Sequence, residues 1–236
     1  MEFLVLFVAV GLGAVVQGSV GFGFALVVVP ALTLLRPEAL PATVLLLSLP
    51  MAATMAVRER HAIDVPGLAY LLLGRLAGTF GGVGLLLLVP DSHLSVLFGS
   101  LVVAAVIASS FSPEVDLRNR TRVAGGIASG IMGTAAGIGG PPLALIYQSR
   151  SGPQIRATLA IAFSMGTMIS ILALAIAGRV GPEHLLLALG LLPALLLGLW
   201  SARLAAGLLA GRWLRPAVLL FAAVSGLVAV LLGIVR

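Results

Sequence analysis

Long apolar runs recur along the whole chain and leave little room for charged residues. The runs are near 20 residues, long enough to cross a hydrocarbon core of about 30 Å. Only 9% of the 236 residues are charged, against about 25% in an ordinary soluble domain. The sequence therefore predicts an all-α polytopic membrane protein embedded in a lipid bilayer. Its apolar segments are 3–35, 41–57, 66–89, 94–110, 122–149, 155–177, 184–202 and 214–235.

The charge is strongly basic, but its pattern does not favour nucleic acid as a partner. The net charge is +6, and every basic residue is arginine. These arginines stand singly or in pairs between apolar runs, so we interpret them as markers of cytoplasmic loops. The absence of cysteine excludes disulfides and cysteine-based metal sites. The start Met1-Glu2-Phe3 lacks a basic region, so we expect no removed signal peptide.

Two apolar segments are too long for one membrane span. Segment 3–35 would measure about 50 Å as a single helix, and segment 122–149 about 42 Å. Their middles, residues 17–23 and 133–142, are rich in glycine, and the second also contains two prolines. Glycine and proline disfavour helix continuation. We therefore expect two short helices joined by an irregular stretch in each segment.

The distribution of arginine indicates how these broken segments run. If both cross the membrane fully, six arginines lie on one side and seven on the other. If both return to their starting side, the division becomes ten against three, which orients the rich side to the cytoplasm. We predict two re-entrant hairpins and six full spans in the inner (plasma) membrane, with both termini on the periplasmic side. The arginine-poor side holds Arg36, Arg179 and Arg236.

The two halves of the chain also repeat. An offset of 116 residues places Gly21-Phe22-Gly23 on Gly137-Ile138-Gly139, and Pro66 on Pro182. Each half, 1–116 and 117–236, would be one hairpin plus three spans. Because three is odd, the second half enters the membrane inverted, a plan common among secondary transporters.

The two glycine-rich stretches are the candidate site. Irregular backbone at membrane depth is tolerated only where it is buried in protein or lines a cavity. The helix starts that follow would present N–H groups with partial positive charge, which suits a small anion. The alternative is tight helix packing through small residues. The candidate binding residues are Gln17, Gly18, Ser19, Gly21, Phe22 and Gly23 in the first stretch, and Gly133, Thr134, Gly137, Gly139, Gly140 and Pro141 in the second.

Arg75 is the basic residue that lies inside a span. It sits about 14 Å along segment 66–89, near mid-membrane. Such a charge either faces a cavity, where it would bind or attract an anion, or extends to the membrane surface or pairs with a carbonyl group near the cytoplasmic face. Both alternatives stay open from the sequence. Gly74, Gly78 and Gly82 beside it follow the spacing typical of close helix packing.

The two glycine-rich stretches resemble those of the TauE/SafE sulfite exporter family of membrane permeases. The resemblance covers essentially the whole chain and implies transport of sulfite, sulfonates or related sulfur-containing anions. One departure concerns Phe24-Ala25, which stands where the second stretch has Gly140-Pro141. The matching motifs are Gln17-Gly18-Ser19-Val20-Gly21-Phe22-Gly23 with Pro30, and Gly133 with Gly137-Ile138-Gly139-Gly140-Pro141-Pro142.

Several absences narrow the mechanism. The sequence has no phosphate-binding Gly-Lys-Ser/Thr loop, no clustered metal ligands and no acidic residue inside a span. We therefore expect no cofactor, no metal and no enzymatic activity, and a carrier suited to export or uniport. The alternatives are a carrier of another anion, such as a carboxylate, and a non-transporting membrane scaffold. Pairing into a homodimer stays open.

Overall fold

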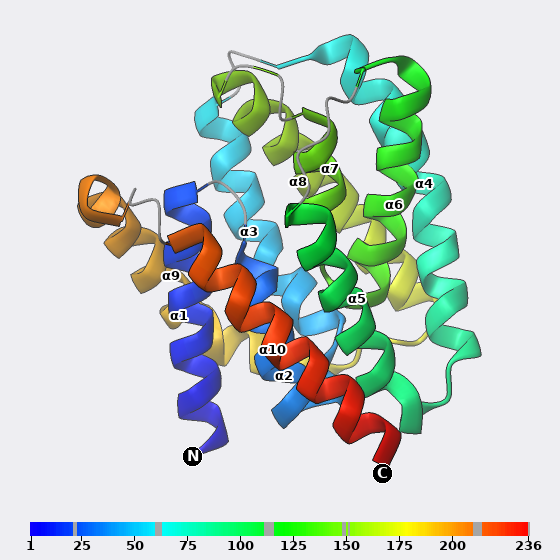
Figure 1. The fold of residues 1–236 in the computed structure, drawn as a ribbon, viewed down its shortest axis with the longest axis vertical. Helices are drawn as coiled ribbons and strands as arrows, with labels where there is room; N and C mark the ends of the chain where they lie inside the picture. Colours follow the sequence, from blue (N-terminus) through cyan, green and yellow to red (C-terminus); the bar gives the residue numbers. More distant parts are fainter. Residues whose placement is uncertain are drawn as a thin grey trace.

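The computed structural model describes residues 1–20, 23–59, 63–110, 116–147, 150, 152–209 and 214–235, and its regular structure there consists of helices. No strand occurs in these ranges, which confirms the predicted all-α class (Figure 1). The helices are α1 (Glu2–Val20), α2 (Phe24–Leu35), η1 (Pro37–Ala39), α3 (Ala42–Glu59), α4 (Val65–Leu88), η3 (Asp91–His93), α5 (Leu94–Ser110), α6 (Asn119–Ala136), α7 (Gly140–Tyr147), α8 (Gly152–Ile176), α9 (Pro182–Leu209) and α10 (Leu214–Val235).

Within the described ranges, six stretches are long and apolar enough to cross a membrane, and they lie in α1, α4, α5, α8, α9 and α10. They make the protein a multi-pass membrane protein, as predicted. The set differs from the expected six spans at two helices. The first half of the predicted hairpin, α1, reaches spanning length by itself, whereas segment 41–57 corresponds to α3, whose apolar part is shorter (Ala42–Val57).

Segment 3–35 is interrupted, as the glycine content predicted. Helix α1 ends at Val20 and α2 begins at Phe24; residues 21–23 between them are called the first break. Arg36, which follows α2, places its Nε atom 3.6 Å from the Glu2 carboxylate at the start of α1. The far end of α2 thus returns to the beginning of α1, so the two helices form a hairpin.

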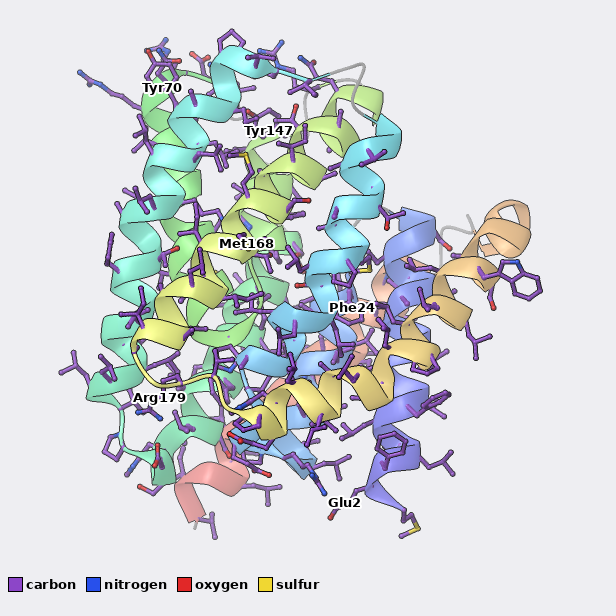
Figure 2. All side chains as sticks on the ribbon, turned by 180° about the vertical axis from the view of Figure 1, so that it is seen from behind. Glu2, Phe24, Tyr70, Tyr147, Met168 and Arg179 are labelled. Carbon is purple, nitrogen blue, oxygen red and sulfur yellow. The ribbon has the colours of Figure 1, made fainter. Side chains whose placement is uncertain are left out.

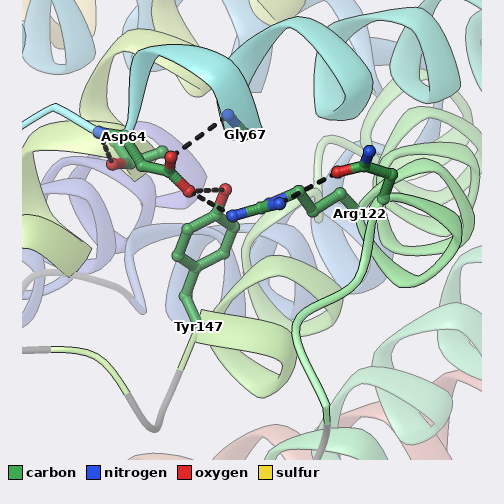
Figure 3. Close-up of polar contacts among 6 residues, drawn as sticks. Asp64, Gly67, Arg122 and Tyr147 are labelled. Carbon is green, nitrogen blue, oxygen red and sulfur yellow. Dashed lines mark hydrogen bonds and ion pairs between the residues drawn. The ribbon is translucent and has the colours of Figure 1, made fainter.

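Segment 122–149 is interrupted in the same way, at residues 137–139, called the second break. Gly137 ends α6 with a φ of 77°, a left-handed conformation that glycine adopts without steric cost. Arg122 near the start of α6 and Tyr147 at the end of α7 both contact the Asp64 carboxylate, at 2.8 and 3.4 Å (Figure 3). This hairpin also returns to its starting end.

The two hairpins open toward opposite ends of the molecule. Figure 1 shows both chain termini at one end, where Arg179 pairs with Asp91. Figure 2 places Glu2 and Arg179 at this end and Tyr147 at the other, with Phe24 between them. The termini therefore lie at the same end of the molecule. Which end faces the cytoplasm remains a prediction.

Helices of one half pack mainly on helices of the other. Helix α4 packs along α6, and α1 packs along α9. The remaining large interfaces join α3 to α8 and α5 to α10. The counterparts in the two halves are α1 and α6, α3 and α8, α4 and α9, and α5 and α10. If each helix is exchanged with its counterpart, the α4–α6 pair becomes the α9–α1 pair, and the set of four pairs stays the same. The inverted symmetry of the halves in space stays a prediction, although this pairing is what it requires.

Glycine brings α4 and α6 into direct backbone contact. Gly74 faces the carbonyl oxygen of Val123, and Gly78, one turn later, faces that of Ile127; a Cβ atom at either position would overlap the oxygen. The small-residue spacing on α4 is therefore an interface for close helix packing, as predicted. Arg75 lies between these two glycines in sequence, so the same contacts fix its position along α6.

Candidate functional site

A cavity lies between the two breaks. It has a volume of about 60 Å³, where a single water needs about 10 to 15 Å³ on the same measure. The cavity is therefore large enough for one small oxyanion. Residues predicted from the sequence that line it are Gln17, Gly23, Arg75, Gly133, Gly137, Gly139, Gly140 and Pro141.

Arg75 is the charged group of this cavity. Its side chain is only 1% exposed, so it lies inside the protein and does not extend along α4 to the membrane surface. Its Nη1 atom donates a hydrogen bond to Ser129 Oγ at 2.6 Å, and the guanidinium carbon lies 5.9 Å from the centre of the Phe163 ring. Of the two alternatives left by the sequence, the geometry favours the one in which Arg75 faces a cavity.

Ser129 connects Arg75 to the second break. Its hydroxyl accepts from Arg75 and donates to the carbonyl oxygen of Gly139 at 2.6 Å. Because Gly139 directly precedes α7, this chain of two hydrogen bonds ties the guanidinium in α4 to the start of that helix. Ser129 was not among the predicted site residues.

Three glycines make the space in which the guanidinium lies. A Cβ atom on Gly133 would be 3.2 Å from Arg75 Nη2, and one on Gly139 would be 2.9 Å from Nη1. A Cβ atom on Gly166, in α8, would overlap Arg75 Nε. The arginine therefore fits only because α6, the second break and α8 each lack a side chain at this height.

The charge of Arg75 has no carboxylate partner among the described residues. Among the residues that the structure describes, no acidic side chain lies within ion-pair distance of Arg75, and its Nε–H group is buried without an acceptor. A buried cation without a counter-charge is energetically costly, at least several kcal/mol in an apolar surrounding. An anion that entered the cavity would relieve that cost.

At the first break, the backbone N–H group that begins α2 has a side-chain partner, which the sequence did not indicate. Gly23 has a φ of 121°, and the Phe24 N–H that begins α2 donates to Gln17 Oε1 at 3.1 Å. The sequence predicted unpaired N–H groups at this helix start. That prediction was wrong for Phe24, whose N–H group donates to the side-chain oxygen of Gln17. Gln17 still lines the cavity next to Phe24.

Two predicted residues point away from the cavity. Thr134 is fully buried and bonds Thr79 and Ser170, at 3.3 and 2.8 Å, so it lies between α4 and α8. Gly18 faces Ala202 of α9. Both residues serve helix packing in this structure.

Three other predicted residues of the first stretch do not contribute a described contact to the cavity. Ser19 is partly exposed, and its buried hydroxyl oxygen has no hydrogen-bond partner among the described residues. Gly21 and Phe22 lie outside the described residues.

Several lining residues were missed by sequence reasoning. Ser48 and Met51 come from α3, and Phe163 and Thr167 from α8. Both helices read as apolar spans without a glycine-rich break, and their charged residues lie only near their ends. The four residues lie one helical turn apart in each helix, a signal that is visible only once the helix faces are known.

Comparison with known proteins identifies the family of the chain. The family described as "Sulfite exporter TauE/SafE" matches residues 5–229, nearly the whole chain and both hairpins. No curated protein and no solved structure matches the chain. The match covers far more than half of the sequence, and the chain therefore belongs to the TauE/SafE sulfite exporter family, a family of membrane transporters.

Proposed function

We propose that the protein is a secondary transporter that carries a small sulfur-containing oxyanion, such as sulfite or an organosulfonate, through the cavity between the two breaks. The observation that carries this proposal is Arg75, a buried cation at the cavity wall with no carboxylate partner among the described residues. The family supports the substrate class. The volume of the cavity suits an anion of this size.

Alternating access is the mechanism that this architecture supports. The α1–α2 hairpin is held at the end of the molecule that carries the termini, and the α6–α7 hairpin at the opposite end. The cavity lies where their breaks meet. Small movements of one half against the other would expose it first to one end and then to the other, as in other carriers with two related halves.

The electrical gradient is sufficient to drive export. An inside-negative membrane potential favours outward movement of an anion by about 2.3 kcal/mol per charge per 100 mV. No acidic residue lines the cavity in the described part of the chain, so a carboxylate that would couple transport to protons is not evident there. We therefore propose uniport, in the export direction, across the inner membrane. Flux that requires an imposed pH gradient would contradict this mechanism.

The test is anion flux in proteoliposomes that contain the purified protein. Sulfite and methanesulfonate should cross, and Arg75→Leu should reduce their flux to background while the variant still inserts. The matched control is Gly84→Ala, also in α4, because a Cβ atom there meets nothing within 4 Å. Preference for carboxylates would indicate a carrier of another class. Normal cellular function combined with no flux of any anion would indicate a scaffold.

A further inference from the structure

We infer that the cavity accepts anions with a single negative charge and rejects dianions. For the sulfur oxyanions, this selects hydrogen sulfite and sulfonates over sulfite dianion and sulfate. The inference rests on the proposed function and sharpens it, because the family assignment does not distinguish these charge states. It follows from the number of positive charges that the described cavity wall provides.

The described lining contains one charged side chain, that of Arg75. The other polar side chains that α1, α3 and α8 contribute are neutral: Gln17, Ser48 and Thr167. The wall segments from α2, α6 and the second break contain no titratable group among the described residues. One guanidinium therefore faces the bound anion, and it stays protonated across the physiological range.

Backbone dipoles add little further positive charge. At each break the end of one helix meets the start of the next, so partial charges of opposite sign lie close together. The Phe24 N–H is occupied by Gln17 Oε1. The α7 start contains Pro141 and Pro142, which have no N–H to donate. Gly139 and Gly140 each have an N–H group at the α7 start, but such neutral donors carry no net charge that would balance a second negative charge.

The surroundings make a second charge costly. Phe24 and Phe163 line the cavity, and the polar side chains on its described wall other than Arg75 are neutral, so a second negative charge would have no cationic partner there. A charge in such a site is tolerated when it is paired, and an unpaired one is strongly disfavoured. A monoanion is neutralised by Arg75. A dianion would leave one charge without a partner at membrane depth.

The experiment compares three anions in proteoliposomes over a pH series, with equal pH on both sides. Methanesulfonate is a monoanion throughout the series and sulfate a dianion throughout. Sulfite changes from monoanion to dianion near neutral pH. We expect constant methanesulfonate flux and background sulfate flux. Sulfite flux should fall as pH rises through its second pKa, by about tenfold per pH unit once the dianion dominates. Each transported molecule should move one negative charge across the membrane.

The same series contains the outcomes that would overturn the inference. Sulfate flux comparable to that of methanesulfonate, or sulfite flux that does not change with pH, would show that dianions are carried. Methanesulfonate flux that falls in parallel with sulfite flux would show that a protein group titrates instead. Each of these results would overturn this inference and leave the proposed function standing. Absence of flux for all three anions would overturn the proposed function itself.

Discussion

Arg75 and Ser129, which lie 54 positions apart in the sequence, meet through a 2.6 Å hydrogen bond in the interior of the protein. The serine passes this connection on to the Gly139 carbonyl oxygen at the second break. The position of the buried charge and the shape of the break are therefore coupled. A hydroxyl suits this role because it can accept from the arginine and donate to the carbonyl at the same time.

The first prediction concerns this hydroxyl. Ser129→Ala should weaken anion binding by about 1.5 to 3 kcal/mol, or roughly 10- to 100-fold, since it removes a hydrogen bond to a charged group. Calorimetric titration of the purified variant with methanesulfonate measures the loss. The matched control is Ser170→Ala, at another fully buried serine that bonds Thr134 rather than Arg75. Equal loss of affinity in both variants would contradict the role of Ser129.

The second prediction concerns the space around the guanidinium. Gly166→Ala should displace Arg75, because the added methyl group would occupy the position of Nε. We expect at least a tenfold loss of flux without loss of membrane insertion. Gly84→Ala is the matched comparison, since its Cβ atom would meet nothing within 4 Å, and its flux should stay near that of the native protein. Full flux in Gly166→Ala would show that the arginine has another stable position.

The features that the sequence predicted correctly are those that depend on local chemistry. The helices are interrupted within both glycine-rich stretches, and the spacing of Gly74 and Gly78 predicted the packing of α4. The arginine count predicted that each hairpin returns to its starting end. Arg75 was recognisable because a charge in an apolar span is rare and costly.

The features that were missed depend on how helix faces are turned toward one another. Gly133 and Thr134 are neighbours in sequence, yet successive residues on a helix point about 100° apart. Gly133 therefore faces the cavity while Thr134 faces α4 and α8. The roles of Ser129 and Gly166 arise from contacts with Arg75 on a different helix. Sequence reading without the tertiary arrangement gives no signal for either residue.

The third prediction concerns the interface between α4 and α6. Gly78→Ala should destabilise the protein by about 1 to 3 kcal/mol, because the methyl group would overlap the Ile127 carbonyl oxygen and force the helices apart. Thermal unfolding in detergent measures this effect. In Gly81→Ala, the methyl group would instead meet the flexible Ile131 side chain at 3.2 Å, so a smaller change is expected. Equal stability of the two variants would contradict the backbone contact as the cause.

The fourth prediction concerns the carboxylate that closes the second hairpin. Asp64 accepts from the backbone N–H of Gly67, which caps α4, and it pairs with Arg122 and contacts Tyr147 (Figure 3). The Asp64 and Arg122 side chains are each 12% exposed. Asp64→Ala would leave Arg122 mostly buried without a counter-charge. Loss of one partner of a buried pair costs about 3 to 5 kcal/mol, and partial exposure should bring the loss toward the lower value.

A matched control separates this effect from a general loss of negative charge. Asp116→Ala removes a carboxylate that pairs with Arg118 at 2.6 Å, but both side chains are more than two-thirds exposed. Such surface pairs contribute about 0 to 1 kcal/mol, so its unfolding temperature should stay near that of the native protein. The chain has no cysteine. An Ile146→Cys substitution in α7 therefore supplies a single thiol, and the rate at which a thiol reagent labels it measures opening of the hairpin. That rate should rise in Asp64→Ala and not in Asp116→Ala; equal rates would show that the hairpin is held closed by its apolar contacts instead.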